Sequence, residues 1–175
     1  MPGSLIPSRF AVARGDGLHM TAGHPTDGVN LLSKAAVSAN LLVAIHRACP
    51  IRQDYHVLSG GVAVPGANGE EYWPDVVVVH GHCSLGQCRP ATPILVVDVD
   101  AGDPNDPAWR ARRDAYLKVH SLQAYFAASC SEKLVEVHRR FSGSWTSLRF
   151  EGHGLVGLPS LGCSVDLKTI YAGLT

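Results

Sequence analysis

Residues 75–80 read DVVVVH and residues 94–99 read ILVVDV, and these two runs decide the fold. Continuous β-branched runs of this length are typical of strands that are covered on both faces, at the centre of a sheet. Residues 31–48 contain no Gly or Pro and repeat their apolar positions at intervals of three and four. This pattern predicts a helix that Pro50 ends.

Shorter elements are predicted around these segments. Pro107 favours the start of a helix over residues 108–120, and a last helix is predicted over residues 167–174. Further strands are predicted at residues 55–58, 62–64, 122–127, 134–140 and 145–150. Strands and helices in this order predict an α/β or α+β fold, in which helices pack on a sheet. The Pro- and Gly-rich residues 1–30 are expected to form an irregular N-terminal arm, and residues 31–175 to form the domain.

The composition limits the class of protein. The chain has 175 residues, with 15 Lys and Arg against 15 Asp and Glu, so its formal net charge is zero. The length suits one domain, and the neutral balance excludes a strongly polybasic nucleic-acid binder while leaving room for a local basic site. Five cysteines, an odd number, argue against a complete disulfide framework and for a reducing compartment. Since the sequence lacks an apolar run of membrane-helix length and a start of signal-peptide form, we expect a cytoplasmic protein without membrane contacts.

Aspartates stand at the ends of both central strands. Asp75 begins the first strand, and Asp98 follows the apolar part of the second. Because side chains alternate along a strand, Asp98 and Asp100 are expected on the same face. Two carboxylates on one face, with a third from a neighbouring strand, can form an oxygen-lined site for Mg²⁺, which prefers hard ligands. In the alternative interpretation, Asp98 and Asp100 face solvent or cap a turn beside Gly102.

The helix predicted at residues 108–120 places an arginine on its buried side. Trp109, Arg112, Tyr116 and Val119 recur at intervals of three and four, and a helix uses such a stripe to face a sheet. A buried charge is costly unless it is paired, so the carboxylates at the sheet end are the expected partners of Arg112. Two alternatives stay open: a purely structural Arg–Asp pair, and an arginine that reaches the surface along its apolar stem.

A set of motifs then occurs in a fixed order. They are WPDVVVV at residues 73–79, PILVVDV at 93–99, R-x-x-x-Y at 112–116, SLQAYFAAS at 121–129, LVEVHRR at 134–140 and GLPSLGCSVDLKTIYAGL at 157–174. In these motifs the chain resembles the restriction endonuclease-like (Uma-type) family of the PD-(D/E)XK nuclease superfamily. The resemblance implies a restriction-endonuclease-like fold, with a mixed central β-sheet flanked by helices and often paired in homodimers. It also implies a Mg²⁺-dependent site that hydrolyses DNA phosphodiester bonds.

Carried over to this sequence, the resemblance implies roles for individual residues. Asp75 and Asp98 would be catalytic and would bind the metal, which is Mg²⁺ or alternatively Mn²⁺. Arg112 would take the position of the catalytic lysine, four residues before Tyr116. Asp100 and Tyr116 are additional candidates for the site.

Three departures from the family pattern argue against full activity. Asp98 replaces a longer Glu, and no acid before residue 31 matches a Glu of the family's N-terminal segment, because Asp16 and Asp27 lie in Gly- and Pro-rich surroundings. Arg112 replaces a Lys, and Arg stays protonated where a Lys can activate water. We therefore expect an endonuclease-like domain of weakened or lost activity. The alternative is a non-catalytic nucleic-acid- or protein-binding module on the same fold.

Basic residues gather on the second predicted helix. Arg110, Arg113 and Lys118 could form a rim that contacts DNA phosphates. The blander interpretation, a solvated helix face, is favoured for such a run.

The loop between the two central strands carries candidate zinc ligands. His80, His82, Cys83 and Cys88 lie close together, but their spacing is not one of the familiar structural zinc patterns. Zinc is therefore disfavoured.

Overall fold

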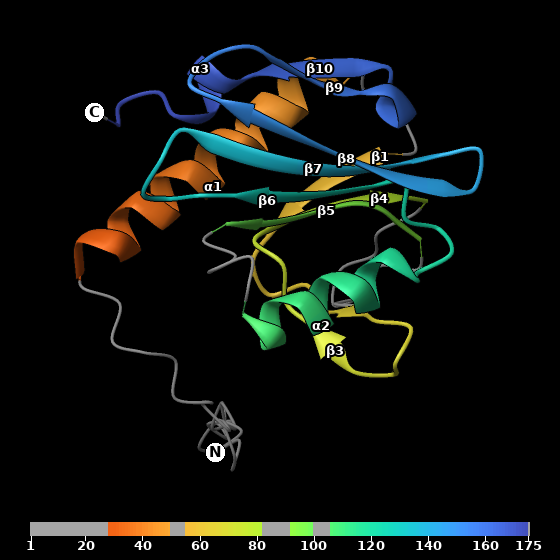
Figure 1. The fold of residues 1–175 in the computed structure, drawn as a ribbon. Coiled ribbons are helices and arrows are strands. Elements are labelled where there is room, and N and C mark those ends of the chain that lie inside the picture. The colour runs from red at the N-terminus through yellow and green to blue at the C-terminus, as the bar shows by residue number, and fades with distance from the viewer. Residues whose placement is uncertain (1–27, 50–54, 82–91, 100–105, 175) are drawn as a thin grey trace, which may run out of the picture.

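A computed structural model describes residues 28–49, 55–81, 92–99 and 106–174, and Figure 1 shows its fold. The elements are α1 (Gly28–Ala48), β1 (Tyr55–Ser59), β2 (Val64–Pro65), β3 (Glu71–Tyr72), β4 (Val76–His80), β5 (Pro93–Val99), α2 (Pro107–Leu117), β6 (Ala124–Ala128), β7 (Leu134–Phe141), β8 (Ser144–Glu151), β9 (Leu155–Leu158), a 3₁₀ turn (Pro159–Leu161), β10 (Cys163–Asp166) and α3 (Leu167–Ile170). This combination confirms the predicted α+β class.

The main sheet has six strands in the order β1-β4-β5-β6-β7-β8. Neighbouring strands are antiparallel except for the pair β5 and β6, which is parallel. Parallel strands cannot be joined by a tight turn, so the chain between them crosses over one face of the sheet, and α2 lies in that crossover. The predicted mixed sheet is therefore present, with β4 and β5 next to each other inside it.

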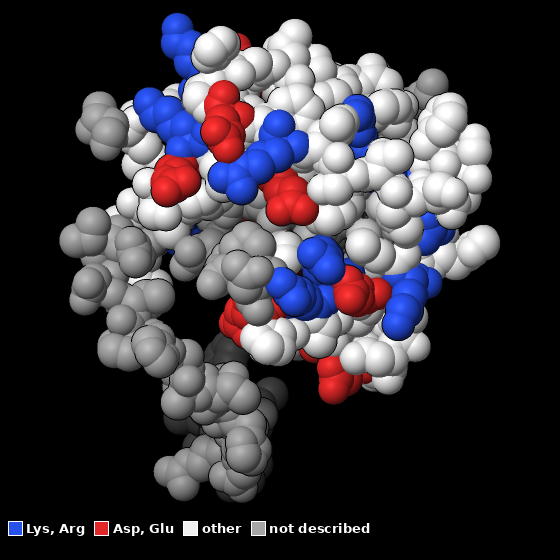
Figure 2. Space-filling view, in the orientation of Figure 1, with Lys and Arg blue, Asp and Glu red and all other residues white. Residues whose placement is uncertain are grey.

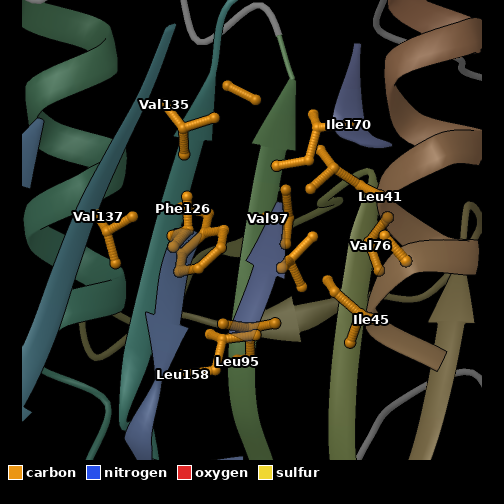
Figure 3. Close-up of a cluster of buried hydrophobic side chains, with 14 of the residues drawn as sticks. Leu41, Ile45, Val76, Leu95, Val97, Phe126, Val135, Val137, Leu158 and Ile170 are labelled. Carbon is orange, nitrogen blue, oxygen red and sulfur yellow. The ribbon is translucent and has the colours of Figure 1, made fainter. Parts of the chain in front are cut away.

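The sheet separates two hydrophobic layers, because alternate residues of each strand point to opposite faces. Helix α1, α3 and the β9–β10 hairpin cover one face, and α2 with β2 and β3 covers the other (Figure 1). On the α1 side, Val76, Val97 and Phe126 meet Leu41 and Ile45 in one buried cluster (Figure 3). Complete burial of side chains of this size contributes about 1.5–3 kcal/mol each.

The second layer lies under α2. Val77, Val96 and Tyr125 of the sheet pack there with Trp109 and Tyr116 of the helix. The buried stripe expected on the second helix is therefore confirmed. Both faces of β4 and β5 are covered, which is the reason why their sequences are continuous apolar runs.

Several element bounds differ from the sequence-based expectations. Helix α1 begins at Gly28 rather than at residue 31, and α2 ends at Leu117 rather than at residue 120. The last helix is short, since α3 ends at Ile170 and Gly173 adopts a positive φ of 79°. The β9–β10 hairpin was not predicted from the sequence. The predicted arm falls almost wholly outside the described residues.

Candidate active site at the end of strands β4 and β5

Asp75 and Asp98 lie at the same end of one antiparallel strand pair. Val76 of β4 pairs with Val97 of β5. Asp75 directly precedes Val76 and Asp98 directly follows Val97, so in this antiparallel pair both lie toward the same end. The amide of Asp75 donates to the carbonyl of Val97 at 3.0 Å, and its Oδ2 accepts from the amide of Val99 at 2.8 Å. Asp75 is thus fixed to the strand that carries Asp98.

The carboxylate of Asp98 is buried and fully engaged. The residue is 2% exposed. Its Oδ1 accepts a hydrogen bond from an Nη of Arg112 at 2.5 Å, and its Oδ2 accepts one from the hydroxyl of Tyr125 at 3.1 Å. Burial raises the pKa of Asp98 to about 6, against the opposing influence of Arg112 and Tyr125. Asp75 raises this pKa too and Lys34 lowers it, so both charges act on Asp98.

Arg112 reaches the sheet from α2, in the manner expected from its position on the buried stripe. The same Nη that binds Asp98 donates to the carbonyl of Trp73 at 3.3 Å. The guanidinium carbon lies 5.9 Å from the centre of the Tyr116 ring, a cation–π distance. Arg112 therefore ties α2 to both β5 and the segment that leads into β4. Asp98 therefore does not face solvent, and the Arg112 side chain turns to Asp98 instead of extending to the surface.

Tyr116 forms part of the wall behind this pair. Its side chain is fully buried, and burial raises the pKa of its phenol. Its ring packs against Tyr72 and Tyr125, with ring centres 5.2 and 5.7 Å away. Tyr116 thus supports the positions of Arg112 and Tyr125.

A lysine that sequence reasoning missed completes the cluster. Lys34 projects from α1, and its Nζ lies 3.3 Å from Oδ2 of Asp75. In the sequence it is the single charged residue of positions 31–45, within an otherwise uncharged helical segment. That isolation was the available signal, but the sequence does not say which strand end the helix passes.

A cavity of about 570 Å³ opens beside Asp75, on the α1 side of the sheet. Its lining includes Lys34 and Ser38 of α1, Gly60 and Gly61 after β1, and Trp73. Trp73 is 55% exposed. Asp98 does not line this cavity, because it faces the layer under α2. The two carboxylates therefore differ in access: Asp75 is open to the cavity and Asp98 is enclosed.

The predicted DNA-contacting rim lies on α2 and just after it. Arg110 and Lys118 are exposed, whereas Arg113 pairs with Asp114 at 3.0 Å and lies over the Trp109 ring at 5.0 Å. On the face shown in Figure 2, basic and acidic side chains are interspersed and do not form a patch of one sign.

Two predictions fall on parts of the chain that are not described. Asp100 lies outside the described residues, as do His82, Cys83 and Cys88 of the candidate zinc loop. Within the described ranges, no group of three or more His, Cys, Asp or Glu side chains could hold a metal ion.

The donor set of Asp75 and Asp98 suits Mg²⁺ in kind, because carboxylate oxygens are the hard ligands that this ion takes. The charge of each carboxylate is already offset, by Lys34 at Asp75 and by Arg112 at Asp98. A divalent ion at this pair would have to compete with these two side chains. The residues thus fit the ion by chemistry, in a site whose charges are balanced without it.

Comparison with known proteins gives a family and a fold. A family model described as "Uma2: Putative restriction endonuclease" matches residues 25–168. A solved structure, described as a putative nuclease belonging to DUF820 from Anabaena variabilis ATCC 29413, is similar over 86% of this chain and 83% of that chain, with a TM-score of 0.62 and 14% sequence identity. At this identity the likeness concerns the fold alone. No curated protein matches the chain.

Among the described residues, no helix is long and apolar enough to span a membrane.

Proposed function

The chain belongs to the Uma2 family, and from this premise we propose that it is a Mg²⁺-dependent DNA endonuclease of weakened activity. The nuclease-like domain is given by the family and the fold. The proposal for the site is supported by one observation: Asp75 and Asp98 lie at the same end of β4 and β5, with Asp75 beside an open cavity. Mn²⁺ is the expected substitute ion. Homodimer formation and a cytoplasmic location, expected from the sequence, belong to the same proposal.

Asp75 and Asp98 would hold the ion, with Asp75 on the side that DNA can reach. When bound, Mg²⁺ supplies Lewis acidity at a phosphate and lowers the pKa of its water. Arg112, next to Asp98, would add positive charge to stabilise negative charge on a phosphate bound there. The DNA backbone would approach through the cavity, since α2 covers Asp98 from the other side. Arg110, Arg113 and Lys118 could contact more distant phosphates.

The weakening follows from the same residues. An arginine stays protonated near neutral pH, so Arg112 cannot accept a proton from an attacking water. Its guanidinium is also committed to Asp98 and to the Trp73 carbonyl. The reaction would then lack general-base help from residue 112, and proton transfer by a positioned side chain typically contributes about 10²–10⁴-fold to a rate.

Cleavage of supercoiled plasmid and of single-stranded DNA in Mg²⁺ or Mn²⁺ tests this proposal. We expect slow nicking by the full chain, which Asp75→Ala and Asp98→Ala each reduce at least about 100-fold. Glu151→Ala is the matched control, because Glu151 is an exposed acid on β8, the edge strand opposite β1. Cleavage that survives both aspartate substitutions would reject this site.

A non-catalytic binding module is the second candidate, and the two ion pairs favour it. With both carboxylates neutralised inside the protein, the site already has the charge balance that a bound ion would give it. This candidate predicts a DNA mobility shift by the wild-type chain together with no cleavage in either metal. Slow metal-dependent nicking, lost in the aspartate variants, decides for the enzyme.

A further inference from the structure

The pair of Lys34 and Asp75 joins α1 to the candidate active site. The ammonium of Lys34 is 3.3 Å from Asp75 Oδ2, and the two side chains are 39% and 20% exposed. Both line the cavity beside Trp73. This ion pair is thus accessible to solvent and to small ions.

The part of α1 that follows Lys34 is anchored to the rest of the fold. Asn40 donates from Nδ2 to the carbonyls of Ile170 and Ala172, at 3.0 Å each. At the end of the helix, the sulfur atoms of Cys49 and Cys163 lie 3.0 Å apart. The face of α1 that packs on the sheet is anchored in the core by Leu41 and Ile45. The long, flexible side chain of Lys34 can therefore bring its positive charge to Asp75 or withdraw it while the anchored part of the helix stays in place.

The two cations of the site differ in how easily they can leave. Arg112 is hydrogen-bonded to a buried carboxylate and to a backbone carbonyl. If it moved away, the charge of Asp98 would be buried without a partner. Lys34 has a partly exposed carboxylate as its partner, and that carboxylate keeps its bond to the amide of Val99 if the lysine withdraws. Surface ion pairs of this kind are weak, so a stronger cation can replace the lysine.

We infer that Lys34 is an internal counter-ion that competes with the divalent metal for Asp75, and thereby lowers the metal affinity of the site. This inference rests on the metal site proposed above and deepens it by naming what regulates its occupancy. Lysine and metal ion are alternative partners of the same carboxylate, since each neutralises it and the two positive charges repel. Without the ammonium, Asp75 carries an unpaired charge that faces the cavity.

The test is the Mn²⁺ affinity of the full chain at low salt, measured from the spin-resonance signal of the free ion. We expect Lys34→Met to bind Mn²⁺ about tenfold more tightly than the wild type, because it removes the competing charge and keeps the apolar stem. Lys34→Arg, which keeps the charge, should bind like the wild type. The double variant Lys34→Met with Asp75→Asn should lose the gain.

Lys168→Met is the matched control and should leave Mn²⁺ affinity unchanged, because Lys168 is an exposed lysine on α3. Lys34→Gln provides a second uncharged variant if Lys34→Met does not fold. Equal or weaker Mn²⁺ binding by the uncharged variants, or no binding at all, would overturn the inference. Weaker binding would mean that the lysine supports the metal site.

The outcome is separate from that of the cleavage experiment. A chain that never cuts DNA can still show tighter Mn²⁺ binding in Lys34→Met, which supports the counter-ion role and rejects the enzyme. Cleavage by the wild type with unchanged Mn²⁺ affinity in Lys34→Met supports the enzyme and rejects the counter-ion role.

Discussion

Arginine at position 112 decides the chemistry of the site at the scale of single residues. One nitrogen of its planar guanidinium binds both Asp98 and the carbonyl of Trp73, and the delocalised charge stays on the group at neutral pH. The residue therefore ties α2 to the sheet, and as an arginine it stays protonated and cannot accept a proton.

Arg112→Lys tests whether the arginine lowers the activity of the site. We expect an increase of about tenfold or more in Mn²⁺-dependent nicking, because the compact ammonium can position or activate a water. Plasmid nicking rates for the wild type and the variant provide the measurement, with melting curves to show that both are folded. An unchanged or lower rate in a folded variant contradicts the view that the arginine weakens the site.

The buried Asp98 makes stability depend on pH. Burial is the main cause that raises the pKa of Asp98 in the folded protein from its ordinary value of 3.8 to about 6. The folded state therefore holds this proton more tightly than the unfolded chain, and stability from this group declines as pH rises from about 4 through about 6. Arg112 limits this decline, because it stabilises the charged form.

Arg112→Met should accordingly cost more at pH 8 than at pH 5. At pH 8 the variant must either bury an unpaired carboxylate or keep it protonated, and we expect a loss of about 2 kcal/mol in unfolding free energy. At pH 5 Asp98 is largely protonated, so the loss should be clearly smaller. Urea unfolding at both pH values measures the difference. Arg149→Met, which removes an exposed pair with Glu151, should show no such pH dependence, and an equal loss at both pH values for Arg112→Met would contradict this account.

At the scale of elements, α2 positions the arginine. Because β5 and β6 are parallel, the connection between them must cross the sheet, and it brings α2 over the face that carries Asp98. The helix starts at a cap: the side chain of Asp106 accepts from the amide of Ala108 at 2.9 Å, and Pro107 follows as the first helical residue. The direction of the short helix thus depends on a local signal in its sequence.

Asp106→Ala should lower the unfolding free energy by about 1 kcal/mol, since one helix-terminal amide loses its acceptor. Asp106→Asn should retain most of the wild-type stability, because an Asn side chain also caps. Thermal or urea unfolding of the three proteins checks the order. If the Asn variant is as unstable as the Ala variant, the charge of Asp106 matters and the cap does not.

At the scale of the whole molecule, the central sheet separates the α1 layer from the α2 layer, and residues from both layers reach the same end of β4 and β5. Lys34 comes from the α1 layer and Arg112 from the α2 layer, and they reach neighbouring carboxylates where β4 and β5 begin and end. Two acidic and two basic groups balance there, in a chain whose net charge is zero. The cavity on the α1 side opens at Asp75.

Much of this could be predicted from the sequence. The uninterrupted apolar runs around Val77 and Val96 fixed the two central strands, because only strands covered on both faces bury every residue. The spacing of Trp109, Arg112 and Tyr116 placed the arginine on the buried side of α2, and its pairing with Asp98 followed from the cost of an unpaired buried charge.

Tertiary structure alone decided the partners that come from distant parts of the chain. Lys34 meets Asp75, Tyr125 meets Asp98 and the Trp73 carbonyl meets Arg112, and no periodicity connects these positions. Local patterns report which face of an element is buried, because they depend on neighbouring residues along the chain. Which charges meet at a sheet end depends on how the helices pack across the layers, and that is settled by the sum of many contacts between segments far apart in sequence.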